Sequence, residues 1–196
     1  MNDPLLRLTN LLLKYRQVER TTHIPGSPEE KENDIEHSYH LAMICLYVID
    51  LNQLTNLNRG RVLELSLCHD VVETYAGDTF FYADDATRQE KAVKEAAAAD
   101  RIHKEFPDFP TLTTAIQEYE DRTTPEACFV YAMDKLVPIL IIYLDGGRLW
   151  KERNISLEQL IESKWPKIEL SPVVVPYLDA ILQKLKADPQ LFNPAF

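Results

Sequence analysis

Apolar residues recur at helical spacing along most of the chain, and this pattern predicts a helical fold. A first helix is expected where four apolar residues share one face: Leu5, Leu8, Leu12 and Tyr15. Asp3 and Pro4 are suited to the cap and the first turn of this helix. Residues 21–32 contain two prolines and a glycine, which predicts a loop. Asn33 or Asp34 is then expected to cap a second helix.

The helical pattern continues beyond a polar break at 52–60. A third helix is expected to begin at about Arg61 and to run through His69 to Thr74, with Gly77 behind it as a terminator. An alanine-rich helix over 87–103 should turn four residues inward: Val93, Ala96, Ala97 and Ile102. Further helices are predicted over 112–120, from Pro125 through Asp134, over 157–164 and over 174–186.

The whole chain is expected to form one all-α domain. No segment alternates convincingly between apolar and polar residues, so no strand is predicted. No repeat, low-complexity tract or linker divides the chain. We therefore expect a single helical bundle over residues 1–196, with C-terminal helices in 151–196.

Composition narrows the functions that this domain could have. A 45% hydrophobic content over 196 residues can bury a sizeable core, and 27% charged residues are typical of a folded protein. A net charge of −10 disfavours binding to a nucleic-acid polymer or an anionic membrane surface. The P-loop, the G-x-G-x-x-G fingerprint and the G-x-S-x-G elbow are all absent from the sequence. The favoured function is therefore small-molecule chemistry that uses none of these three motifs.

Cysteine usage and the N-terminus suggest a cytoplasmic protein. Cys45, Cys68 and Cys128 are far apart and each lies in an apolar stretch, which predicts buried free thiols in a reducing compartment. The first ten residues lack the pattern of a signal peptide. The longest apolar stretch, 127–144, is interrupted by charged residues and a proline, so we expect a core helix there.

Histidines and carboxylates in apolar surroundings are the candidate metal-binding residues. Among the five histidines, His69 is followed directly by Asp70 in an apolar stretch. Asp134 lies in a second apolar stretch, and His37 lies on another predicted helix. A buried carboxylate beside an imidazole is costly unless a cation compensates. Two imidazoles and two carboxylates from three helices would suit one divalent transition metal.

Each of these residues also has a simpler interpretation. A His-Asp pair can occur by chance, and Asp134 could pair with Lys135 or with an arginine. His40 competes with His37, because it lies one turn later on the same predicted helix. Spacing alone leaves the metal site and these simpler interpretations open.

Four motifs in this order resemble those of the HD-domain phosphohydrolases, closest to the branch that includes the bacterial 5′-deoxynucleotidases. They are NDIEHS at 33–38, HDVVE at 69–73, AGDT at 76–79 and DKL at 134–136. EYE at 118–120 and PEA at 125–127 also fit that branch. The resemblance extends over 13–150 and implies an all-helical HD-domain bundle with a metal site between its helices.

The resemblance implies that four residues are metal ligands: His37, His69, Asp70 and Asp134. It places His37 above His40, because His37 occupies the EHS position. One divalent ion per chain is expected, since His103 is the only histidine between the HD pair and the late aspartate. The metal could be Mn, Co, Zn, Fe, Ni or Mg.

Other residues receive catalytic or substrate-binding roles from the same resemblance. Glu73 would be the general acid/base, and its spacing from His69 and Asp70 would place it on their helix face. Asp78 would contact the substrate or the leaving oxygen, with Thr79 beside it, and Arg20 would orient phosphate. Without the family, Glu73 could be an exposed helix carboxylate and Asp78 a turn residue. Lys91 is a weaker phosphate candidate, and a solvated helix lysine is the favoured interpretation.

The expected activity is phosphate release from nucleoside 5′-monophosphates, with deoxynucleotides as the preferred substrates. One departure bears on the sugar, because Thr21 stands where an aromatic residue often follows the arginine in deoxynucleotidases. A nucleotide pyrophosphohydrolase or triphosphohydrolase is the alternative enzyme, and it would need more basic residues around the pocket. A non-catalytic metal- and nucleotide-binding regulatory module is the alternative from another class. The expected partner is a small nucleotide, with homodimerisation open and no nucleic-acid polymer or membrane.

Overall fold

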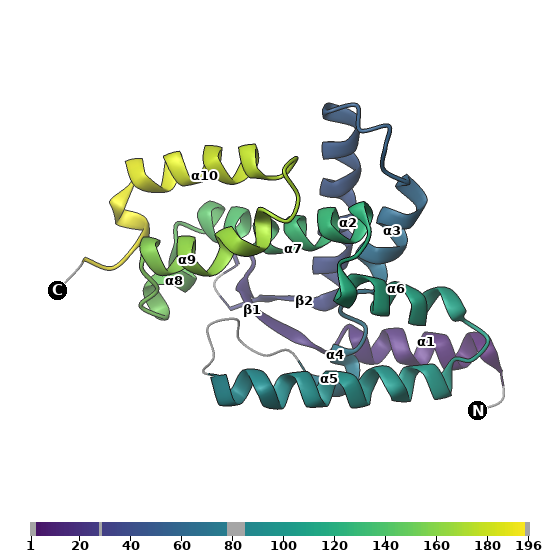
Figure 1. Cartoon of the computed structure of the whole chain (residues 1–196). Coiled ribbons are helices and arrows are strands. Elements are labelled where there is room, and N and C mark those ends of the chain that lie inside the picture. The colour runs from purple at the N-terminus through teal and green to yellow at the C-terminus, as the bar shows by residue number, and fades with distance from the viewer. Residues whose placement is uncertain (1–2, 28, 78–84, 195–196) are drawn as a thin grey trace.

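The computed structural model describes residues 3–27, 29–77 and 85–194, most of which are helical (Figure 1). The helices of the N-terminal half are α1 (Pro4–Tyr15), α2 (Asp34–Leu51), α3 (Arg59–Cys68), α4 (Glu73–Ala76) and α5 (Asp85–Glu105). Those of the C-terminal half are α6 (Pro110–Asp121), α7 (Pro125–Leu144), α8 (Arg148–Glu152), α9 (Leu157–Ile168), α10 (Val175–Ala187) and the 3₁₀ turn η1 (Pro189–Leu191). The predicted helical fold is confirmed.

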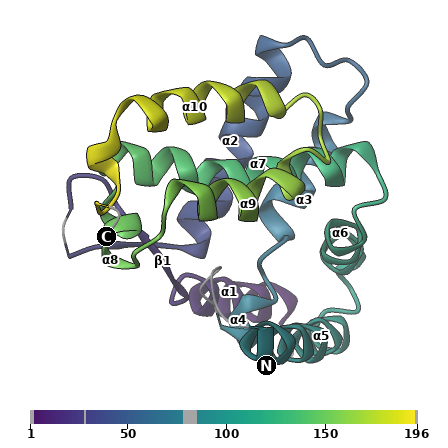
Figure 2. The ribbon, with the colours of Figure 1, turned by 60° about the vertical axis from the view of Figure 1, so that its left-hand side comes forward.

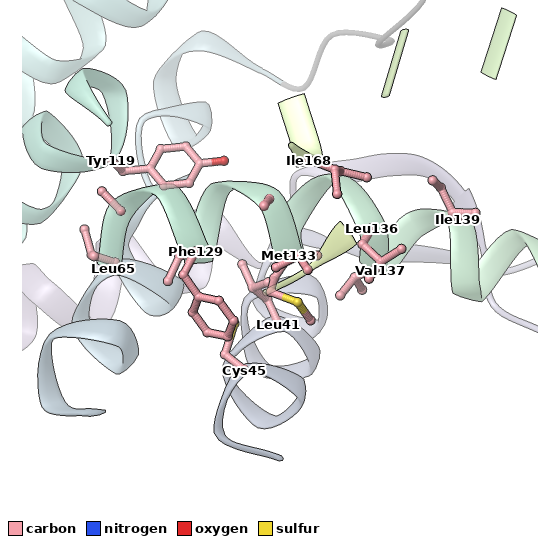
Figure 3. Packing of buried hydrophobic residues seen from close by; sticks show 14 of the residues in the cluster. Leu41, Cys45, Leu65, Tyr119, Phe129, Met133, Leu136, Val137, Ile139 and Ile168 are labelled. Atoms are coloured by element: carbon pink, nitrogen blue, oxygen red, sulfur yellow. The ribbon is translucent and has the colours of Figure 1, made fainter. Parts of the chain in front are cut away.

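Helix α7 forms the centre of the structure. It contacts α2, α3, α6, α9 and α10, and Figure 2 shows it crossing the middle of the molecule. Phe129 and Met133 of α7 lie against Leu41 and Cys45 of α2 (Figure 3). Because neighbours cover α7 on several sides, its buried side chains are held by packing from more than one element.

Helix α7 is also the one helix, within the described residues, that is long and apolar enough to cross a membrane, with a mean hydropathy of 1.8. Its packing against six other helices, α8 included, and its charged residues Asp134 and Lys135 match the core helix that the sequence predicts.

Capping residues place the first two helices as predicted. The Asp3 side chain accepts hydrogen bonds at the start of α1, and Asn33 caps α2. The Glu36 side chain accepts from the Asn33 backbone N–H at 3.2 Å, which completes a capping box. With α2 fixed at Asp34, His37 falls in its first turn.

The prediction of a fold without strands is wrong in one place. β1 (Glu19–His23) and β2 (Lys31–Asn33) pair as an antiparallel hairpin within the stretch expected to be a loop. The hairpin is short, and only Thr22 of β1 is fully buried, so it leaves little alternation in the sequence. It matters for the site, because it holds Arg20 and Thr22 against the helices.

The third helix also ends earlier than predicted. It stops at Cys68, and the backbone then makes i to i+3 hydrogen bonds, from Val71 to Cys68 and from Glu73 to Asp70. These tighter turns replace the α-helix through His69 and Asp70. Gly77, at a φ of 78°, ends the following short helix α4 as expected.

Two expectations about burial need correction. Val93, Ala96 and Ala97 are exposed, because α5 lies at the edge of the structure and turns Ala98 and Ile102 inward. Of the three thiols, Cys45 and Cys68 are buried, and burial raises the pKa of Cys45 to about 12. Cys128 is only half-buried.

Candidate metal centre and pocket

Four side chains that are distant in sequence converge between α2, α3 and α7. His37 comes from α2, His69 and Asp70 from the turn after α3, and Asp134 from α7. One candidate ligand atom from each lies within 4.8 Å of every other. His37, His69 and Asp134 are buried, and Asp70 is half-buried. The structure therefore brings together the four residues that the sequence predicts.

The two imidazoles turn a nitrogen toward the shared space. His69 Nδ1 donates to the Ser66 carbonyl at 3.0 Å, which fixes its tautomer and leaves Nε2 as the acceptor nitrogen inside the cluster. Nε2 has no hydrogen-bond partner among the described residues. His37 Nε2 lies 2.9 Å from Asp134 Oδ1, and its Nδ1 faces the Glu32 carboxylate at 3.6 Å. In each imidazole, the Nδ1 atom thus faces an oxygen outside the four-residue group, and metal-binding histidines need such a group to orient the ring.

The two carboxylates are held in their ionised form. Asp134 Oδ1 faces His37, and its Oδ2 accepts from Tyr119 at 2.6 Å and Lys135 at 2.5 Å. Burial opposes ionisation, but Lys135 and the histidines hold the pKa of Asp134 well below its usual range. Asp134 therefore pairs with Lys135 through one oxygen and still offers the other to the cluster.

Asp70 is supported in the same way from the opposite side. Its Oδ2 accepts from Arg20 Nη1 at 2.9 Å and lies 3.1 Å from His69 Nε2. Although burial opposes ionisation, His69 and Arg20 lower the pKa of Asp70. Two nitrogens and two anionic oxygens at this spacing can hold one divalent transition metal.

The choice between His37 and His40 is supported by their positions. His40 is 54% exposed in its side chain and bonds Glu32 at 3.1 Å, outside the cluster, whereas the His37 side chain is fully buried within it.

This difference gives a direct test. We expect His37→Ala to lose bound metal and His40→Ala to retain it, because only the first removes a nitrogen from the cluster. The metal content per chain of each variant, determined after gel filtration, tests this expectation. Equal metal content in the two variants would contradict the choice.

Glu73 lies beside the cluster rather than in the four-residue group. It is buried, and its Oε1 accepts from Lys91 Nζ at 3.0 Å. Its carboxylate, with those of Asp34 and Asp70, forms a second close group. In tight turns, side chains three residues apart overlie one another, so the i to i+3 bond between residues 70 and 73 explains how Glu73 stands over Asp70.

Arg20 lies inside the site, where β1 carries it to the carboxylates. Its Nη1 donates to Asp34 at 3.1 Å and to Asp70 at 2.9 Å, and its Nε lies 3.5 Å from Glu32. Arg20 therefore joins the hairpin to the cluster. Asp78 and Thr79 lie outside the described residues, so their predicted roles stay predictions.

A cavity of about 120 Å³ opens beside the cluster. Its polar side carries Asp70, Glu73 and Asp134 together with four basic residues: Arg20, Lys91, Lys135 and Lys164. Its apolar side consists of residues from the second half of α7, from α8, from the following loop and from α9: Pro138, Ile139, Ile142, Leu149, Trp150, Ile155 and Leu160. The pocket thus combines a charged end at the cluster with an apolar end.

The sequence analysis missed part of this pocket. Lys91 is not a solvated lysine, because it pairs with Glu73 and with Glu95. Lys164 received no role, although a signal was present. It stands midway between Leu160 and Ile168 at four-residue spacing, so a lysine occupies the inward face of α9.

Comparison with known proteins supports this description. Residues 12–172 match the family model described as HD domain. The 5′-deoxynucleotidase HDDC2 of Xenopus laevis is 33% identical over 140 residues, which are 69% of this chain and 66% of that protein. The 5′-deoxynucleotidase hdd1 of Schizosaccharomyces pombe (strain 972 / ATCC 24843) is 24% identical over 88% of this chain and 86% of its own length. The match to the Xenopus protein thus spans about two thirds of its length.

Solved structures agree in fold. A predicted metal-dependent phosphohydrolase from Magnetospirillum magnetotacticum MS-1 superposes with a TM-score of 0.81 at 28% identity, over 96% of both chains. The PH0347 protein from Pyrococcus horikoshii OT3 gives a TM-score of 0.62 at 24% identity, over 92% of this chain and 97% of its own, and shows the fold alone.

Proposed function

This chain belongs to the HD-domain family, and from that premise we propose that it is a metal-dependent phosphohydrolase that releases phosphate from nucleoside 5′-monophosphates, with deoxynucleotides preferred. The observation that carries the proposal is the cluster of His37, His69, Asp70 and Asp134 at the charged end of a half-apolar pocket. Phosphate suits the charged end, and a nucleoside suits the apolar end.

The four cluster residues are proposed to hold one divalent ion. Such an ion supplies Lewis-acid chemistry, drawing charge from a phosphate group and acidifying water. His69 is oriented for this by the Ser66 carbonyl, and Asp134 by Tyr119. This support keeps the donor atoms aimed at one point before substrate arrives.

Glu73 is proposed to be the general acid/base. Lys91 holds its Oε1, which fixes the carboxylate in the pocket, and Oε2 is the atom that would take a proton from the attacking water. The same proton is then available to the leaving alcohol. Asp78 is proposed to contact the leaving oxygen, with Thr79 beside it.

Arg20 is proposed to orient the phosphate. It lines the pocket and is held by the carboxylates of Asp34 and Asp70. Its guanidinium is fixed in direction by these ion pairs, and a planar cation of this kind suits a tetrahedral phosphate.

One observation favours a second candidate. The pyrophosphohydrolase or triphosphohydrolase alternative needs several basic residues, and four line the pocket. The regulatory module is the remaining alternative, and a buried Glu73 beside the cluster argues against it, because metal binding alone would not need that residue.

A substrate panel separates these functions. With Mn²⁺ or Co²⁺, we expect orthophosphate release from nucleoside monophosphates, faster from dAMP than from AMP, and no turnover of DNA, RNA or phospholipid. The reason is a small pocket in an acidic protein with a net charge of −10.

The other outcomes of the panel are equally informative. Pyrophosphate or triphosphate release would favour the alternative enzyme, and metal binding without turnover would favour the regulatory module. Nuclease activity without mononucleotide hydrolysis would refute the proposal. Equal rates on dAMP and AMP would remove the sugar preference alone.

Cellular context and assembly are also part of the proposal. Two buried, unreactive thiols suit a reducing cytoplasm, where we place the protein. Homodimerisation stays a prediction that gel filtration with light scattering would test.

A further inference from the structure

Lys164 stands in an unusual place for a lysine. It lies on α9, and only 6% of it is exposed. It occupies the inward face of that helix between Leu160 and Ile168, both of which are buried in the core. Burying a lysine at such a position is costly, so a functional reason for it is expected.

The surroundings of Lys164 are those of the active pocket. It lines the same cavity as Lys135 and the cluster residues Asp70 and Asp134. Helix α9 packs along α7, which carries Lys135 and Asp134. Lys164 therefore shares one cavity with the charged residues of the cluster and with Arg20 of the β-hairpin.

We propose that Lys164, together with Lys135, binds the phosphate group of the substrate, so that helix α9 completes the anion-binding part of the pocket. This inference rests on the proposed function. It gives a substrate-binding role to a segment that carries none of the HD motifs.

Electrostatics support this assignment. Burial and the neighbouring Lys135 lower the pKa of Lys164 well below its usual range, and Asp134 only partly opposes this shift. A positive charge on Lys164 is therefore unfavourable beside Lys135, and an anion bound between the two side chains would offset that cost. A phosphate dianion has the charge and the acceptor atoms for both ammonium groups.

Binding of the two reaction products tests the proposal without turnover. In Mn²⁺-loaded protein, calorimetry would measure orthophosphate and deoxyadenosine separately. We expect Lys164→Met to weaken orthophosphate binding by about 10- to 100-fold, the usual scale for a hydrogen bond to a charged group, and to leave deoxyadenosine binding unchanged. KM for dAMP should rise similarly, with kcat little changed.

Controls keep this test decisive. Lys167→Met, on the same helix but outside the pocket lining, should bind both products normally. Lys164→Gln keeps a polar side chain without the charge and should behave as Lys164→Met, and circular dichroism and metal content would verify the fold of each variant.

The outcomes also separate this inference from the proposed function. Unchanged orthophosphate binding would overturn the role of Lys164, and so would equal loss of both products. If no nucleotide is hydrolysed but orthophosphate binding still depends on Lys164, the proposed function fails and the phosphate site stands.

Discussion

Replacing Glu73 with alanine should lower turnover by about 10²- to 10⁴-fold, the usual scale for losing a general acid or base. Glu73 lines the pocket and lies over Asp70, but it is outside the four-residue cluster. Metal and nucleotide should therefore still bind nearly normally. Steady-state kinetics on dAMP, together with metal content and nucleotide titration, measure the three quantities separately.

The structure offers a matched control for this experiment. Glu95 pairs with the same Lys91 Nζ at 3.2 Å but does not line the pocket, so Glu95→Ala should keep near-normal turnover. Glu73→Gln keeps the side-chain volume and should lose turnover as Glu73→Ala does. Loss of metal in either Glu73 variant would make this residue a ligand. Unchanged turnover would move the reaction away from the HDxxE motif.

The helices were predictable because their signals are local. Asp3 and Asn33 cap α1 and α2 as expected, and Gly77 ends α4. The β-hairpin was not predictable in this way. Its strands pair across a seven-residue connection, and β1 is held by contacts with α7 and α8. Tertiary contacts therefore decide its structure more than local pattern does.

The convergence of the cluster could be predicted only in part. The motifs named His37, His69, Asp70 and Asp134, and the structure brings these four together. The backbone conformation predicted before Glu73 was wrong, since a continuous helix was expected where the chain makes tight turns. Glu73 reaches the site all the same, because both geometries place residues three apart on one side.

The basic residues of the pocket show where sequence patterns fail. The spacing of Leu160, Lys164 and Ile168 marks the inward face of α9, but it does not show which part of the structure that face meets. Lys91 and Lys164 lie on α5 and α9, outside the motifs, and reach the pocket only through packing of these helices. Long-range packing thus supplies the part of the site that recognises charge.

Replacing His69 with alanine should remove both the bound metal and the phosphohydrolase activity. Wild-type protein should carry about one divalent ion per chain, held by two imidazoles and two carboxylates. His69 is 1% exposed, and its Nε2 faces the cluster, so the substitution removes one of the four candidate ligand atoms. Elemental analysis of purified protein and phosphate release from dAMP would measure the two losses.

Thermal unfolding with a chelator separates metal loss from simple destabilisation. A ligand that binds only the folded state raises its stability, so chelation should lower the melting temperature of the wild-type protein. His69→Ala should melt lower than wild type, because it leaves a cavity and buried carboxylates, and chelator should lower it no further. His103→Ala, at an exposed position on α5, should respond to chelator as wild type does. Full metal occupancy in His69→Ala, or a chelator shift equal to that of wild type, would rule out this cluster as the metal site.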